Sequence, residues 1–173
     1  MSLNTILAIV TAAMLAQSPA FAQNIANEEQ GDEQAQENSN EKRFYSRSLT
    51  GSWNLQVTRL NCQTGAVIGT APAMLSFMRG GTMIDTGTQV SPALRGVGHG
   101  VWHEHSRGYY TAAFQFFRFN ADGTLSGKQV IRQQIALNHA GTEFTNTSNA
   151  NVLDVNGVVI ATNCSIAIGT RIE

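Results

Sequence analysis

The fold is decided by two stretches at the ends of the folded part of the chain, GSWNLQVTRLNC at residues 51–62 and NCSIAIGTR at residues 163–171. If these stretches pair as antiparallel strands, the register that places Trp53 opposite Arg171 also places Cys62 opposite Cys164 to within one residue pair. The first and last strands become neighbours only when a sheet closes on itself and leaves no free edge. The sequence therefore predicts a closed β-barrel.

Between these stretches, β-rich runs alternate with turn signals and show no helical period. Residues 53–60 alternate apolar side chains with Asn, Gln and Thr, which is typical of a half-buried strand. Asn156-Gly157 is a strong hairpin signal. The expected strands are residues 53–60, 73–78, 82–86, 99–105, 109–119, 124–137, 142–153 and 158–172. These eight segments predict an all-β, antiparallel up-and-down barrel.

The first 22 residues have the pattern of a cleaved secretory signal. An apolar run from Ile6 to Leu15 is followed by Pro19 and by Ala20-Phe21-Ala22, an A-x-A-like site just before Gln23. The run is too short to cross a bilayer comfortably, so stable membrane insertion is not expected, with an uncleaved anchor as the alternative. The pattern predicts a periplasmic or extracellular protein.

Residues 23–49 are predicted to be a disordered acidic linker that precedes a single barrel domain at residues 50–173. From Gln23 to Glu41 the chain is rich in Gln, Asn and Glu and has no basic residue, so it has little apolar surface to offset the entropy of ordering. The barrel domain has only two more basic than acidic residues. Nucleic acid is therefore not an expected partner, because its phosphates require a dense basic face.

The chain has two cysteines, Cys62 and Cys164, and no C-x-x-C spacing. In an exported protein such a pair is expected to form a disulfide rather than a metal or redox site. A crosslink that closes about 100 residues stabilises a fold by up to roughly 4 to 5 kcal/mol. No metal or other cofactor is predicted.

The interior of an eight-stranded barrel is either filled by side chains or holds one small ligand. Residues 109–119 supply large aromatic side chains, whereas residues 142–153 are mostly Thr, Asn, Ser and Ala, and this contrast favours a lined pocket over simple packing complementarity. The sequence does not decide which face of the strand at residues 109–119 points into the barrel. Either Phe114 and Phe116 or Phe117 and Phe119 face inward. The predicted ligand-binding residues are Trp102, Phe114, Phe116, Arg118 and Asp85.

The Gly51-Ser52-Trp53 entry, the eight-strand meander and Arg171 in the last strand together resemble the lipocalins and the wider calycin group. The resemblance implies two structural roles, with Trp53 as the floor of the barrel and Arg171 as a cation–π lid over it. The chain is also similar to the allene oxide cyclase-like barrels, which enclose long apolar substrates. That second resemblance implies a cofactor-independent isomerase or cyclase.

Candidate catalytic groups are concentrated in residues 95–110. His99 lies between two glycines that allow close backbone approach, and Arg95 precedes it, so the two could move a proton and stabilise an oxyanion. Glu104 shares a strand face with Trp102 and would be a buried acid, paired with Arg118 or Arg59, if that face points inward. Tyr110 is the fourth candidate. Turn geometry and structural ion pairing explain the same residues without catalysis.

His103 and His105 have the spacing of a metal-chelating pair on one strand, with His99 too distant to be an easy third ligand. Because a zinc site needs three or four ligands, an exposed strand end is the preferred interpretation. The chain has no G-x-S-x-G elbow and no phosphate-binding glycine loop, which argues against hydrolases, dehydrogenases and kinases.

The assumed register also creates a conflict, because it turns Ile166 and Ile168 outward if Trp53 points inward. Either these isoleucines form a surface for homo-oligomers or for an envelope protein, or a bulge near Gly169 shifts the strand phase. The leading expectation is a carrier or sensor of a small apolar or amphipathic molecule. An isomerase or cyclase is the alternative, and a structural envelope protein is the third possibility.

Overall fold

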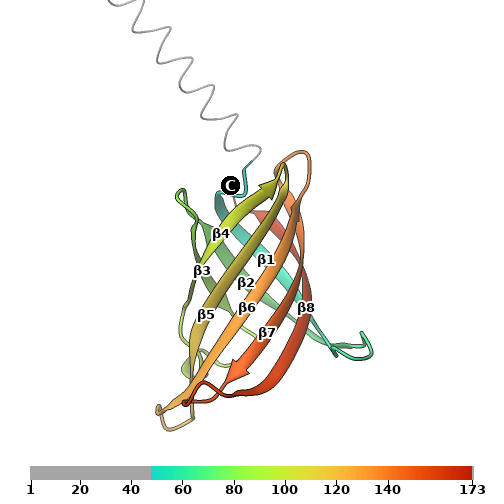
Figure 1. The fold of residues 1–173 in the computed structure, drawn as a ribbon. Coiled ribbons are helices and arrows are strands. Elements are labelled where there is room, and N and C mark those ends of the chain that lie inside the picture. Colours follow the sequence, from blue (N-terminus) through green and yellow to red (C-terminus); the bar gives the residue numbers. More distant parts are fainter. Residues whose placement is uncertain (1–47, 173) are drawn as a thin grey trace, which may run out of the picture. The chain divides into compact units, whose positions relative to one another are not determined.

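A computed structural model describes residues 48–172, which form a closed barrel of eight antiparallel strands in sequential order (Figure 1). The strands are β1 (Gly51–Leu60), β2 (Val67–Phe77), β3 (Thr82–Gly87), β4 (Gly98–Ser106), β5 (Tyr109–Phe119), β6 (Leu125–Leu137), β7 (Glu143–Leu153) and β8 (Val159–Arg171). One short 3-10 turn, η1 (Pro92–Leu94), interrupts the loop between β3 and β4. The predicted fold class is confirmed. The predicted signal peptide and nearly all of the predicted linker lie outside the described residues.

The barrel closes in the register that the two terminal stretches predict. Trp53 pairs with Arg171, and the ladder continues without a shift to Leu60, which pairs with Cys164. Cys62 lies in the turn beyond the end of β1, and the predicted disulfide joins it to Cys164 with 5.2 Å between the Cα atoms. Both the closure and the crosslink are therefore confirmed.

One end of the barrel is filled by large side chains, and we call this packed end the floor. Its fully buried members are Trp53, Phe77, Phe144, Leu49, Leu75, Met83 and Ile135. The rings of Trp53 and Phe144 meet edge to face with 4.8 Å between their centroids, and Phe77 lies 6.2 Å from Phe144. Figure 1 shows the C-terminal end of β8 at the upper end of the barrel and the β5–β6 and β7–β8 hairpins at the opposite, lower end.

The parity of β5 places Phe114 and Phe116 inside the barrel, with exposed fractions of 6% and 8%, while Phe117 is 60% exposed. Ile166 and Ile168 face outward and are exposed, and the β1–β8 ladder has no shift near Gly169. The bulge considered at that position is therefore wrong. The outward orientation follows directly from the inward orientation of Trp53.

The packed part of the chain begins earlier than the predicted linker boundary. Leu49, placed in the linker by composition, is fully buried, and its carbonyl oxygen accepts a hydrogen bond of 2.9 Å from Nε1 of Trp53. Ser48 and Thr50 also contribute carbonyl groups to the floor. The barrel domain thus includes residues 48 and 49. Among the described residues, no helix is long and apolar enough to cross a membrane.

Candidate ligand-binding cavity

A cavity of about 210 Å³ occupies the interior between the floor and the opposite end of the barrel. Small inward side chains make this space, because Ala73, Ser148, Ala150 and Ala167 stand where larger residues would fill it. The cavity reaches solvent beside Arg59 and Asn163, which line it and are exposed. We call this opening the mouth. The barrel is therefore packed in one half and hollow in the other.

Most of the lining is apolar. Phe114 and Phe116 project from β5, Leu55 and Val57 from β1, and Ile131 from β6. These side chains lie on the inward faces of their strands because successive residues of a strand alternate between the two sides of a sheet. They give the cavity a surface suited to a hydrocarbon or aromatic group.

A buried ion pair forms one polar part of the lining. Arg95 follows the η1 turn, points into the barrel, and its Nη2 donates to Oδ2 of Asp85 from β3. The guanidinium also lies 3.8 Å above the centroid of the Phe116 ring. Burial raises the pKa of the Asp85 carboxyl, and the Arg95 charge and hydrogen bond oppose that rise without cancelling it. The ion pair joins the β3–β4 loop to β3, and the contact of Arg95 with Phe116 joins the loop to β5.

The second polar part consists of amides and a hydroxyl from β6 and β7. Gln133, Asn146 and Ser148 are buried and line the cavity. Oε1 of Gln133 and both side-chain polar atoms of Asn146 have no hydrogen-bond partner among the described residues. Buried polar groups in proteins are normally paired, so these atoms are available to bind a polar group or a water inside the cavity.

The lining contains three cationic residues, Arg59, Arg95 and Arg118, and one anionic residue, Asp85. Since Arg95 and Asp85 neutralise each other, two cationic side chains remain, and Arg59 is at the exposed mouth. This excess of positive charge disfavours a cationic ligand and accommodates a neutral or anionic one.

Four of the five predicted ligand-binding residues line the cavity: Asp85, Phe114, Phe116 and Arg118. The fifth, Trp102, lies at the floor instead. Its Nε1 donates to the carbonyl oxygen of Met78 at 3.1 Å, and its ring centroid lies 6.0 Å from that of Phe77. Trp102 is therefore a packing residue of the floor.

The four candidate catalytic residues do not form one site, although Glu104 and Tyr110 are cross-strand partners on β4 and β5. Arg95 lines the cavity, whereas His99 and Glu104 are exposed, and Tyr110 is buried at the floor with its ring 5.7 Å from that of Trp102. The conditional expectation that Glu104 is a buried, paired acid is wrong, because that face of β4 ends at the surface. Burial, and secondarily the Glu104 carboxylate, raise the pKa of Tyr110, which keeps its phenol protonated.

His103 and His105 point to the outside of β4, on the same face as His99. Within residues 48–172, no group of three or more His, Cys, Asp or Glu side chains lies close enough to hold a metal ion. The outer position of these histidines follows from Trp102 packing inward, since neighbouring residues of a strand face opposite sides.

The floor below the cavity is closed by Trp53 and Arg171. The guanidinium of Arg171 lies 4.2 Å from the centroid of the Trp53 ring and donates to the carbonyl oxygens of Ser48, Thr50 and Gly141. Gly51 has a φ of 129°, and a Cβ at that position would lie 2.6 Å from Nη1 of Arg171. The glycine of the Gly51-Ser52-Trp53 stretch therefore leaves room for the arginine.

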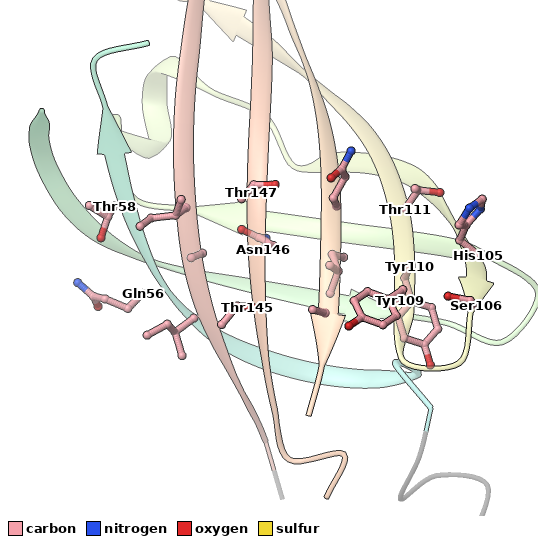
Figure 2. A pocket seen from close by; sticks show the side chains of 16 residues that line it. Gln56, Thr58, His105, Ser106, Tyr109, Tyr110, Thr111, Thr145, Asn146 and Thr147 are labelled. Carbon is pink, nitrogen blue, oxygen red and sulfur yellow. The ribbon is translucent and has the colours of Figure 1, made fainter. Parts of the chain in front are cut away.

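A second, larger hollow of about 970 Å³ lies on the outer face of β1 and β4 to β8 (Figure 2). Figure 2 labels outward residues that line it, among them Gln56, Thr145, Thr147 and Tyr109. Its apolar side chains are open to solvent, as Tyr109 is 61% and Ile168 is 52% exposed. A ligand there would remain largely hydrated, so the interior cavity is the better candidate site.

Gln133, Asn146 and Ser148 are the buried polar residues of the lining that the sequence interpretation did not assign to the ligand site. The sequence does indicate Gln133, because it lies two residues from both Ile131 and Ile135 and so shares their strand face, which is buried. A polar residue in phase with a buried apolar face is a candidate for a buried polar site. Asn146 and Ser148 give a weaker signal, because Phe144 and Val152 are the only large apolar residues on that face of β7 and the face between them is polar or small.

Comparison with known proteins adds no family assignment. A scan against protein-family models finds no match. Searches of the curated proteins and of the solved structures also find no match. The cavity itself is therefore the basis for a functional assignment.

Proposed function

We propose that this protein binds a small amphipathic molecule inside the barrel and acts as a carrier or sensor outside the cytoplasm. The observation that carries the proposal is the contrast between the two halves of the interior. Seven large side chains pack the floor with exposed fractions below 2%, whereas alanines and a serine keep the other half hollow. A barrel selected only for stability would fill both halves, because voids in a core are destabilising.

The size of the cavity limits the ligand. A water molecule occupies about 30 Å³ in the liquid, so a cavity of about 210 Å³ has room for about seven waters, or a compact ligand of about ten nonhydrogen atoms. A long acyl chain would have to extend through the mouth past Arg59. A single aromatic ring with a polar substituent fits the apolar and polar parts of the lining together.

The extracytoplasmic location is supported by two features. The disulfide between Cys62 and Cys164 is of a kind that persists in oxidising compartments. The N-terminal sequence has the pattern of a secretory signal. The closed meander with Arg171 over Trp53 supports the resemblance to lipocalin-like carriers, although it specifies no ligand.

Native mass spectrometry of the protein purified from its own host tests the proposal. The expected result is a copurifying small molecule that is released on unfolding. Ala150→Leu would fill the cavity and should abolish the adduct, while Ala136→Leu, on the outer face of β6, should retain it. The proposal fails if wild-type protein carries no adduct and gains no stability from a panel of small aromatic probes.

A further inference from the structure

Two neighbouring amide side chains in the cavity wall lack partners. Gln133 and Asn146 are 7% and 4% exposed, and Oε1 of Gln133 together with Oδ1 and Nδ2 of Asn146 make no hydrogen bond in the described part of the chain. Leaving a buried polar group unpaired disfavours the folded state. Three such atoms on two adjacent strands are thus a feature that packing alone does not explain.

The strand register places the two amides side by side. Gln133 pairs with Ser148 and Asn146 pairs with Ile135, so Gln133 and Asn146 are diagonal neighbours on the inward faces of β6 and β7. Diagonal neighbours in an antiparallel ladder are about 7 to 8 Å apart, a span that one small polar group can bridge. Figure 2 shows Asn146 on β7 between the labelled Thr145 and Thr147.

The residues next to this pair leave space in front of it. On β5, Gln133 is opposite Ala112, and on β8, Asn146 is opposite Ala167. Alanine is too short to reach either amide, so neither neighbouring strand supplies a partner. The cavity in front of the pair is the remaining source of one.

The wall around the pair is uncharged. The inward side chains of β6 and β7 are apolar, amide or hydroxyl groups, and the charged residues of these two strands face outward. Elsewhere in the lining, Arg95 and Asp85 neutralise each other, and the two remaining cations, Arg59 and Arg118, belong to β1 and β5 and not to the wall that holds the amides. An ionised ligand group placed against the amides would lose its hydration without gaining a counter-charge from β6 or β7.

We propose that Gln133 and Asn146 bind the polar end of the ligand, and that this end is an uncharged group that both donates and accepts hydrogen bonds, as a carboxamide or lactam does. The inference depends on the proposed function, because it assigns the inner end of the same ligand. Nδ2 of Asn146 donates to the carbonyl of that group, and Oε1 of Gln133 accepts from its N–H. The apolar part of the ligand then lies against Phe114 and Ile131.

Three probes of nearly equal size separate the possibilities: benzamide, benzoate and toluene. Each has about seven to nine nonhydrogen atoms and fits the cavity by volume. Dissociation constants are measured by titration calorimetry on the full chain, with protein-observed NMR for weak binding. Wild-type protein should bind benzamide about tenfold more tightly than toluene, and benzoate no more tightly than toluene.

Gln133→Met and Asn146→Leu test the assigned side chains. Both replace an amide by an apolar group of similar shape, which is close to neutral for folding when the amide is unpaired. Each should remove most of the preference for benzamide while toluene binding persists. Gln134→Met and Asn149→Leu are the matched controls, because these amides lie on the outer faces of the same strands and should leave the preference unchanged.

The outcomes distinguish this inference from the proposed function. If toluene and benzamide bind equally, or if benzoate binds best, the assigned head group is wrong while binding in the cavity stands. If the inner variants keep the preference, the two amides are not the binding groups and are satisfied by water alone. If none of the probes binds, the assigned head group is wrong, and the proposed function fails with it when the wild-type protein also carries no copurifying adduct.

Discussion

Arg171 at the end of β8 lies over the indole ring of Trp53 at the start of β1, with 4.2 Å between the guanidinium carbon and the ring centroid. The same guanidinium donates to Ser48 at 2.6 Å, to Thr50 at 2.7 Å and to Gly141 at 2.7 Å. One side chain therefore ties together the segment before the first strand, the β6–β7 turn and the last strand. This relationship closes the end of the barrel opposite the mouth.

Arg171→Met should weaken the floor without changing the fold. The variant keeps part of the apolar contact with Trp53 but loses three hydrogen bonds to carbonyl groups, so the free energy of unfolding should fall by about 2 to 4 kcal/mol. Urea unfolding followed by tryptophan fluorescence measures the change. Arg132→Met, at an exposed position on β6, should shift stability by less than about 0.5 kcal/mol. Equal effects of the two substitutions would contradict the assigned role.

Gly169→Ala should be strongly destabilising although it adds only one methyl group. A Cβ at Gly169 would overlap the ring of Phe144, which packs against Trp53. Because the floor is close-packed, displacement of Phe144 should cost about 1 to 3 kcal/mol. Gly69→Ala is the matched control, since the nearest atom to a Cβ there is Nη2 of Arg59 at 3.9 Å. The thermal midpoint of the control should equal or exceed that of the wild type.

The Asp85 and Arg95 pair should behave as a coupled unit. Arg95→Met alone leaves the Asp85 carboxylate buried without its counter-charge and should reduce the free energy of unfolding by about 3 to 5 kcal/mol. The double variant Asp85→Leu with Arg95→Met removes both charges and should recover most of that loss. A double-mutant cycle by urea unfolding measures the coupling. Additive effects of the two substitutions would show that the pair is not energetically linked.

The stability of the protein should carry a pH dependence from Asp85. Burial raises the pKa of this carboxyl above its ordinary value of 3.8 even with Arg95 beside it. In the pH window between the ordinary and the raised pKa, the folded state therefore holds more protons than the unfolded state. This contribution to stability is fully present below the ordinary pKa and is lost as the pH rises through the raised value.

Asp85→Asn isolates this effect, because the amide approximates the protonated carboxyl at every pH. The stability of the wild type relative to Asp85→Asn should decrease as the pH is raised from about 3.5 to about 8. Urea unfolding of both proteins across this range is the measurement. An increase of the relative stability over the same range would mean that the Arg95 charge outweighs burial.

The closure of the barrel could be predicted because it depends on the spacing of a few residues. Trp53 and Arg171 specify a register, and the cysteines repeat it to within one pair. The extent of β2 was harder to predict, because Gly69 and Pro72 resemble breaks in a strand. β2 starts at Val67 but pairs with β3 only from Ala73 onward, so Pro72 lies where the β3 side of the strand is unpaired and its missing N–H is tolerated.

The cavity could be predicted only in part, because the facing of a strand is decided by tertiary packing. Phe114 and Phe117 are equally aromatic in the sequence, and the structure turns the first inward and the second outward. The sequence predicts Trp102 as a ligand-binding residue, yet the structure packs it at the floor against Phe77. Gln133 and Asn146 became visible as a pair only when the β6–β7 register was known.

The most direct test of a ligand site inside the barrel is to locate a bound probe by NMR in methyl-labelled protein. Isoleucine methyl groups report on both candidate surfaces, because Ile131 lines the interior cavity and Ile166 and Ile168 line the outer hollow. With benzamide or toluene bound, intermolecular NOEs to Ile131 and none to Ile166 or Ile168 are the predicted result. NOEs confined to Ile166 and Ile168 would place the ligand on the outer face and contradict binding inside the barrel.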